Sequence, residues 1–147
     1  MLIQIVLGTA LIFLSILVAG LAFWAMEVLL ARLRPWLLRE PHRPKLALML
    51  SVSVVWVLIV VTAGVWIWAF TLRALGIFAT MEASVYFSLV AFTTLGFGDI
   101  LLPLEWRLLG GMAAANGLLS MGLLTAMLIE VLRHVRLSQI EDRRRKH

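Results

Sequence analysis

Three long apolar runs limit what this chain can fold into. They cover residues 5–31, 46–72 and 108–129, and the only charged residue among them is Glu27. Each run is long enough to cross a hydrocarbon core, which requires about 20 helical residues. With 63% hydrophobic and 14% charged residues, the composition also exceeds what a soluble core of this size needs. The sequence therefore predicts an all-α integral membrane protein with three transmembrane helices.

The first apolar run has a cleaved signal peptide as its alternative interpretation. No basic residue precedes the run, and it exceeds the usual signal core of about 7–15 residues. We therefore expect a transmembrane helix. Glu27 lies near one end of it, close to Arg32 and Arg34, and a carboxylate there is favoured as a snorkelling or paired group over a proton sensor.

The distribution of basic residues predicts the topology. The linker 32–45 holds five Lys and Arg residues and the tail 133–147 holds six, which together are eleven of the thirteen in the chain. Since basic loops stay on the cytoplasmic side, we expect a cell-membrane protein with its N-terminus outside and its C-terminus inside. The same clusters could bind anionic lipid headgroups, although the topological signal alone explains them. A net charge of +5 arranged in this way does not indicate nucleic-acid binding.

The sequence offers little for catalysis. It contains no cysteine, which excludes disulfide bonds and thiolate metal sites. None of its titratable residues shows the nucleophile–base or metal-ligand spacing of an enzyme. We predict neither an enzyme nor a cofactor.

The segment 93–99 reads Thr-Thr-Leu-Gly-Phe-Gly-Asp and precedes the last long run. Gly96 and Gly98 alternate with larger residues, so the backbone can adopt conformations that turn successive carbonyl groups to one side. Four such strands around an axis would form rings of oxygens able to replace the water around a cation. A bare Gly-x-Gly usually marks only a turn, and the neighbouring threonines, aspartate and apolar runs make this one more specific.

A short apolar run, 81–92, leads into this segment. It is too short to span a membrane, and it follows Thr80, whose hydroxyl suits a helix N-cap. Glu82 would lie in the first turn, where the helix dipole favours an acid. We expect a re-entrant helix here.

The segment 93–99 resembles the selectivity filter of potassium channels, Thr-Val-Gly-Tyr-Gly-Asp, with Leu95 in the valine place and Phe97 in the tyrosine place. Further on, Gly117 follows Arg107 by ten residues, a spacing similar to that in the inner helix of small two-helix bacterial potassium channels. The resemblance extends over residues 82–132, about a third of the chain.

The resemblance implies a potassium-selective channel in which four copies of the chain surround one pore, with K+ as the permeant ion. The filter residues that it implies are Thr94, Leu95, Gly96, Phe97 and Gly98, with K+ bound at Thr94, Leu95, Gly96 and Phe97. The residues that it implies around the filter are Asp99 at the outer mouth and Tyr86, Phe87 and Thr93 as supports.

Two positions depart from the pattern of that family. Val90 stands where some bacterial relatives carry a glutamate behind the filter, so we expect no carboxylate network there. Between Asp99 and Arg107 the link is one residue short, and Pro103 falls one residue late. We therefore expect an outer mouth of a different shape.

Two interpretations of the last run disagree about the side that faces water. Helical periodicity gathers the more polar positions on one face, which consists of Asn116, Ser120, Met127, Glu130 and His134. The resemblance instead directs Leu118, Met121 and Thr125 toward the pore cavity. We favour the second interpretation because the match is free of gaps, which leaves Asn116 and Ser120 to hydrogen-bond with neighbouring helices. The small residues Gly117 and Gly122 are interpreted as hinge or close-packing positions.

The chain thus divides into an N-terminal transmembrane helix with a basic linker (1–45), a channel-like pore domain (46–132) and a short basic tail (133–147). One filter motif cannot enclose an axis, which predicts a homotetramer. Passive K+ conduction is the leading hypothesis. A weakly selective cation channel, based on Leu95 and Phe97, and a non-conducting structural or regulatory subunit are the alternatives. The gating stimulus stays open, including pH sensing by Glu27, Glu130 or His134.

Overall fold

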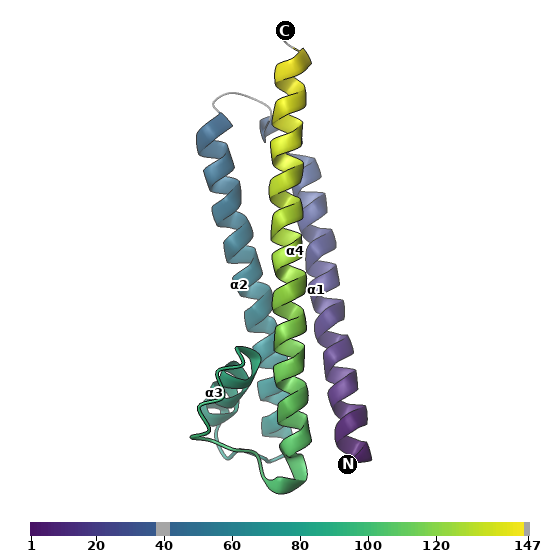
Figure 1. Ribbon diagram of the computed structural model, residues 1–147, viewed down its shortest axis with the longest axis vertical. Helices are drawn as coiled ribbons and strands as arrows, with labels where there is room; N and C mark the ends of the chain where they lie inside the picture. Colours follow the sequence, from purple (N-terminus) through teal and green to yellow (C-terminus); the bar gives the residue numbers. More distant parts are fainter. Residues whose placement is uncertain (38–41, 146–147) are drawn as a thin grey trace.

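A computed structural model describes residues 1–37 and 42–145, and over these residues the chain is helical with no strand. Its elements are α1 (Leu2–Leu37), α2 (His42–Ala74), α3 (Met81–Phe92), a 3₁₀ turn (Leu104–Trp106) and α4 (Arg107–Arg145). Figure 1 shows the three long helices side by side, with α3 packed at the end where the N-terminus lies. Helices α1 and α4 run in the same direction and α2 runs in the opposite one.

Three helices are long and apolar enough to cross a membrane. The candidate spans are Leu2–Leu33, Ala47–Ala74 and Leu104–Arg133, whereas α3 has only 12 residues. These spans confirm the predicted all-α class with three transmembrane helices. They also extend beyond the predicted apolar runs, because polar residues continue each helix past the hydrocarbon-length segment.

The predicted linker 32–45 is largely helical. Helix α1 continues to Leu37 with Pro35 in its last turn, and α2 begins at His42 with Pro44 in its first turn. A proline is tolerated in a first turn because an amide there has no partner within the helix. Near the end of α1, Pro35 removes one hydrogen bond and the described helix ends two residues later.

Helix α3 has the predicted bounds. Thr80 is extended, with φ −123° and ψ 152°, and its hydroxyl accepts a hydrogen bond from the Ala83 amide at 3.2 Å. Glu82 lies in the first turn. The N-cap prediction is therefore confirmed, and this cap fixes where the chain turns from α2 into α3.

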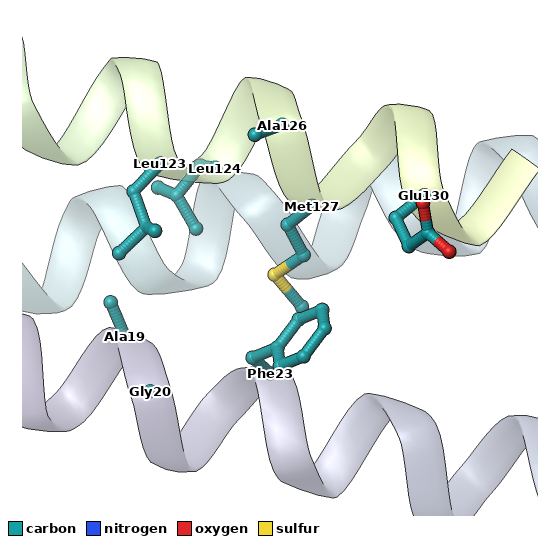
Figure 2. Close-up of a pocket in the computed structure, with 8 residues that line it drawn as sticks. All are labelled: Ala19, Gly20, Phe23, Leu123, Leu124, Ala126, Met127 and Glu130. Carbon is teal, nitrogen blue, oxygen red and sulfur yellow. The ribbon is translucent and has the colours of Figure 1, made fainter.

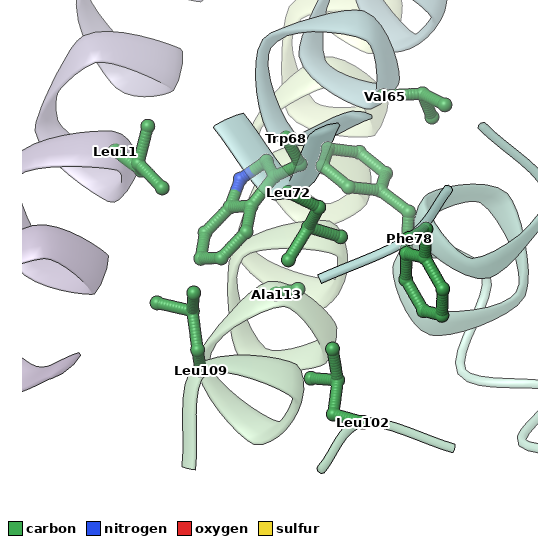
Figure 3. Packing of buried hydrophobic residues seen from close by; sticks show 9 residues of the cluster. Leu11, Val65, Trp68, Leu72, Phe78, Leu102, Leu109 and Ala113 are labelled. Carbon is green, nitrogen blue, oxygen red and sulfur yellow. The ribbon is translucent and has the colours of Figure 1, made fainter. Parts of the chain in front are cut away.

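Buried apolar side chains form two clusters. The cluster beside α3 joins residues from all four helices and from the loops before and after α3, as Figure 3 shows. Its members are Leu11, Val65, Trp68, Leu72, Phe78, Phe92, Leu102, Leu109 and Ala113. The second cluster lies in the half of the bundle away from α3, and its members are Ala19, Met26, Leu30, Met49, Val60, Leu124, Met127 and Val131. The first cluster packs the short helix against α2 and α4 and continues to Leu11 of α1.

Helix α1 follows α4 in a constant register. Its buried residues Gln4, Ser15 and Met26 are eleven residues apart, and buried Leu109 and Ser120 of α4 repeat at the same interval. An eleven-residue repeat corresponds to about 3.67 residues per turn and favours a slight right-handed supercoil. The two helices therefore pack as a parallel pair along much of their length.

Candidate functional site

The segment after α3 leaves the helix through a Schellman-type end. Thr93 is the C-cap, and Thr94, with φ 58°, has the left-handed conformation that glycine usually adopts at this position. The Thr94 amide donates to the Ala91 carbonyl at 2.9 Å, and the Leu95 amide donates to the Val90 carbonyl at 3.1 Å. A left-handed threonine costs on the order of 1–3 kcal/mol. The segment therefore begins at a strained residue.

Left-handed residues then recur at every second position. Gly96 has φ 60° and Gly98 has φ 76°, and Thr94 is the only described non-glycine residue with a positive φ. Leu95 and Phe97 therefore lie outside the left-handed region. This alternation allows successive carbonyl groups to turn to one side of residues 94–98, which we call the strand although they belong to no β-sheet. Such a row of oxygens is a ligand set for a dehydrated cation.

The side chains of this segment are uncovered within one chain. Leu95 is 59% exposed and Phe97 is 67% exposed. Thr93 is also exposed, and its hydroxyl donates to the Leu89 carbonyl at 2.8 Å, which closes the last turn of α3. Large apolar side chains gathered at one exposed site usually contact another surface.

The far end of the segment is tied back to α3. The Tyr86 hydroxyl donates to Oδ2 of Asp99 at 2.5 Å. This hydrogen bond holds the pKa of Asp99 below its usual value. It also raises the pKa of Tyr86, and partial desolvation and the nearby carboxylate charge act in the same direction. The strand is thus anchored at its start by the end of α3 and at its finish by Tyr86.

Helix α3 is itself wedged between α2 and α4. Phe92, its last residue, is 1% exposed, and a Cβ built on Gly64 of α2 would lie 2.8 Å from the Phe92 ring. A Cβ on Gly117 of α4 would overlap the backbone carbonyl of Phe92. Phe87 packs on Phe78 with ring centroids 5.4 Å apart. Gly117 is therefore a point of close backbone approach between α4 and the end of α3.

Helix α4 presents two different faces. Asn116 and Ser120 are buried, and Nδ2 of Asn116 donates to the Ser15 hydroxyl of α1 at 2.9 Å. On the other side, Leu118 is 67% exposed and Met121 is 38% exposed.

Thr125, Gly122 and Glu130 of α4, which the sequence analysis also singled out, lie in different surroundings. Thr125 is exposed, and its hydroxyl donates to the Met121 carbonyl within α4. A Cβ built on Gly122 would have no atom within 4 Å apart from the neighbouring backbone of its own helix. Glu130 is exposed, and one of its carboxylate oxygens lies 3.9 Å from Arg133. The side chain of His134 lies outside the described residues.

A cavity of about 390 Å³ lies between α1 and α4, in the half of the bundle away from the strand. Figure 2 shows Met127 of α4 facing Phe23 of α1 across it, with Glu130 at one end. The other residues that line it are Ala19, Gly20, Leu123, Leu124 and Ala126. The cavity is therefore mainly apolar and does not include any residue of the segment 93–99.

The described residues contain no cluster of acidic or histidine side chains for a metal ion. No group of three or more His, Asp or Glu side chains among them is close enough to hold a metal ion. The alternating backbone of the segment 93–99 is the candidate ion site.

Sequence reasoning did not identify the roles of Gln4 and Ser15, whose side chains join α1 to the 3₁₀ turn and to α4. Nε2 of Gln4 donates to the Glu105 carbonyl, and Ser15 accepts from Asn116. The signal in the sequence was the eleven-residue spacing between Gln4, just before the first apolar run, and Ser15 within that run. The spacing between Glu105 and Asn116 matches it.

Comparison with known proteins gives one match. A family model described as an ion channel matches residues 54–134, which is more than half of the chain. The match begins inside α2, contains α3 and the segment 93–99, and ends inside α4, so α1 lies outside it. Searches of curated proteins and of solved structures found no significant match.

Proposed function

This chain belongs to the two-helix, pore-loop ion channel family, and from that membership we propose that it forms a pore that conducts K+ passively. The observation that carries the proposal is the alternating backbone of the strand, with left-handed residues at Thr94, Gly96 and Gly98. Carbonyl oxygens aligned in this way replace the hydration shell of K+. The binding positions are Thr94, Leu95, Gly96 and Phe97, and Asp99 concentrates cations at the outer mouth.

The pore is a homotetramer in this proposal. One strand supplies only a quarter of a ring of oxygens, so the ligand set is incomplete without further copies. The exposed side chains of Leu95 and Phe97 support the proposal, because neighbouring copies would cover them. The exposed face of α4 with Leu118, Met121 and Thr125 would then line the cavity below the filter.

A weakly selective cation channel is the second candidate. It draws on Phe97, which has no hydroxyl to anchor the strand from behind and is 67% exposed. Selectivity rests on the number and geometry of backbone oxygens, however, and a side chain changes it only by distorting the strand. The anchors at Thr94 and at Asp99 hold the strand at both ends, which favours the potassium-selective pore.

Flux through purified protein in liposomes tests the proposal. We expect K+ flux to exceed Na+ flux by at least about tenfold, which corresponds to about 1.4 kcal/mol, and Ba2+ to block it. Equal K+ and Na+ fluxes from a well-folded tetramer would favour the weakly selective channel instead. No flux at all, or a stable monomer or dimer as the sole species in native mass spectrometry, would contradict a tetrameric pore.

Two glycine variants locate the pore. Gly96→Ala places a Cβ on a residue with φ 60° inside the strand and is expected to abolish K+ flux. Gly76→Ala is the matched control, because Gly76 has φ 70° and open space around it but lies in the turn after α2. Retained flux in Gly96→Ala would show that the ions pass elsewhere.

The orientation in the cell membrane is also part of the proposal, with the N-terminus outside and the basic clusters inside, near anionic lipid headgroups. In this cysteine-free chain, single cysteines at Ile3 and Arg133, both exposed, are expected to be labelled from opposite sides of intact cells. Labelling of Ile3→Cys and Arg133→Cys from one side would contradict this orientation.

A further inference from the structure

Helix α1 lies outside the family match and yet is hydrogen-bonded to the rest of the bundle at three points. One of them joins it to α2, where Nε1 of Trp56 donates to the Ala22 carbonyl at 3.2 Å. The other two connect it to α4 and to the turn before α4. At its start, Gln4 donates to the backbone carbonyl of Glu105, next to the beginning of α4. In its middle, Ser15 accepts a hydrogen bond from Asn116. Both pairs are 101 residues apart in the chain, so they belong to one parallel register. Helix α1 therefore follows α4 as a parallel partner over at least three turns.

The contact between Ser15 and Asn116 is a short relay of hydrogen bonds. The Ser15 hydroxyl donates to the Leu11 carbonyl at 2.8 Å and accepts from Nδ2 of Asn116 at 2.9 Å. Asn116 is 0% exposed and Ser15 is 5% exposed. Because no water competes at this depth, loss of the Ser15 hydroxyl would leave the Asn116 amide group without a partner. The relay therefore fixes both the axial position and the rotation of α1 on α4.

The relay residue Asn116 is next in the chain to Gly117, which contacts the end of α3 from which the strand begins. Gly117 follows Asn116 directly, and its backbone touches the backbone carbonyl of Phe92. Phe92 is the last residue of α3, and the strained Thr94 begins the strand two residues later. A continuous set of contacts therefore runs from Ser15 through α4 to the start of the strand.

We propose that Ser15 and Asn116 are positioning residues for the ion filter, through which α1 holds α4 against the end of α3. This inference rests on the proposed function. The contact between Gly117 and Phe92 has no side chain that could absorb a displacement, so a small rotation of α4 moves the Phe92 carbonyl and the residues that follow it. The hydrogen bond to Ser15 opposes that rotation. Helix α1 thereby acts on ion conduction without contacting the ions.

The test measures the K+/Na+ flux ratio and the K+ flux per tetramer in liposomes, together with the thermal stability of each variant. Ser15→Ala and Asn116→Leu are expected to lower the flux ratio by about threefold to tenfold, the range that one interhelical hydrogen bond supports. The double variant is expected to lose no more than the larger single loss, since both changes remove the same bond. Ser15→Thr keeps the hydroxyl and is expected to retain the wild-type ratio.

Ser53→Ala is the matched control. Ser53 is also buried, at 3% exposed, and its hydroxyl donates to the Met49 carbonyl at 2.8 Å, as Ser15 donates to Leu11. No interhelical hydrogen bond to Ser53 is present among the described residues. Ser53→Ala therefore removes a buried serine hydroxyl and its hydrogen bond within the helix, as Ser15→Ala does, but leaves the hydrogen bond between α1 and α4 intact. We expect a wild-type flux ratio for this variant.

The outcomes separate this inference from the proposed function. If Ser15→Ala and Asn116→Leu lower thermal stability but keep the wild-type flux ratio and flux per tetramer, the bond only holds α1 in place and the inference is wrong while the channel stands. Equal losses in Ser15→Ala and Ser53→Ala, or failure of Ser15→Thr to retain the ratio, would also overturn it. A wild-type protein without selective K+ flux would contradict both.

Discussion

The two flanks of α4 are built in different ways. On the flank toward α3, the contact at Gly117 joins backbone to backbone, and the Phe92 ring fills the space beside Gly64. On the flank toward α1, Gly8 faces the flexible end of Met112, and a cavity of about 390 Å³ lies farther along the same pair of helices. The contact at Gly117 involves no side-chain atom that could move independently of the backbone, whereas the contact at Gly8 does.

This difference indicates which contacts of α4 need an exact backbone position and which can adjust through side-chain movement. A strand that coordinates ions through its backbone must be held to a fraction of an ångström, so its supporting helix needs contacts without slack. On the α1 flank, the hydrogen bond from Asn116 to Ser15 sets the register, and side chains farther along the pair can adjust. Substitutions that add volume should therefore be felt unequally on the two flanks.

The largest effect is expected on the α3 flank, from Gly117→Ala. The new methyl group would overlap the Phe92 carbonyl, and relief requires a shift of α4 or of the end of α3. Overpacking costs typically about 1–3 kcal/mol where side chains can adjust, and here the backbone must move, so we expect a loss of at least about 3 kcal/mol. Thermal unfolding of the purified protein measures it.

Gly20→Ala provides the control for that substitution. Gly20 lies in α1 at the cavity, and no atom is within 4 Å of a Cβ built there. Alanine favours the helix over glycine by about 1 kcal/mol at most, so the melting temperature should stay the same or rise slightly. If Gly117→Ala melts like Gly20→Ala, the backbone contact is not the constraint described above and the two flanks do not differ.

An intermediate effect is expected on the α1 flank, from Gly8→Ala. A Cβ there meets the thioether end of Met112, which can rotate away. The cost of that repacking, about 1–3 kcal/mol, is partly offset by the higher helix propensity of alanine, about 1 kcal/mol. We expect a net loss of about 1 kcal/mol, measured in the same melting assay. A loss as large as that of Gly117→Ala would make the α1 flank as rigid as the α3 flank.

Much of the pore unit followed from local signals in the sequence. The bounds of α3 could be predicted because the Thr80 cap and the lengths of the apolar runs are local features. The left-handed residues at Gly96 and Gly98 likewise follow from the side chain that glycine lacks. The left-handed conformation of Thr94 could not be predicted in the same way, because the end of α3 imposes it.

The attachment of α1 depended on packing, which the sequence does not specify. A helix that is apolar on all sides gives no periodicity that identifies its buried face. Only Gln4 and Ser15 marked that face in α1, and their partners lie 101 residues away. For Gly117 the sequence allowed both a hinge and a close contact. In the structure the Phe92 backbone occupies the space that a side chain at position 117 would need, which is a close contact. The tetramer and the cavity-facing residues stay predictions.

The smallest effect is expected at the outer end of the strand, from Tyr86→Phe, and it sharpens the comparison because this anchor is a single exposed hydrogen bond rather than a backbone contact. The variant loses the bond to Asp99 and keeps the ring, so the fold and the flux at neutral pH should change little. The hydroxyl holds the pKa of Asp99 below its usual 3.8, and its removal lets that pKa rise. The stability that the bond provides is present above the usual pKa of the carboxyl group and is lost as pH falls through the lowered one. Asp99 should therefore lose its charge at a higher pH in Tyr86→Phe than in the wild type.

Single-channel K+ conductance, measured from neutral pH into the acid range, should fall at a higher pH in Tyr86→Phe than in the wild type. Asp99→Asn should remove this step from both profiles. Superimposable profiles for the wild type and Tyr86→Phe would show that Tyr86 does not govern the charge at the outer mouth.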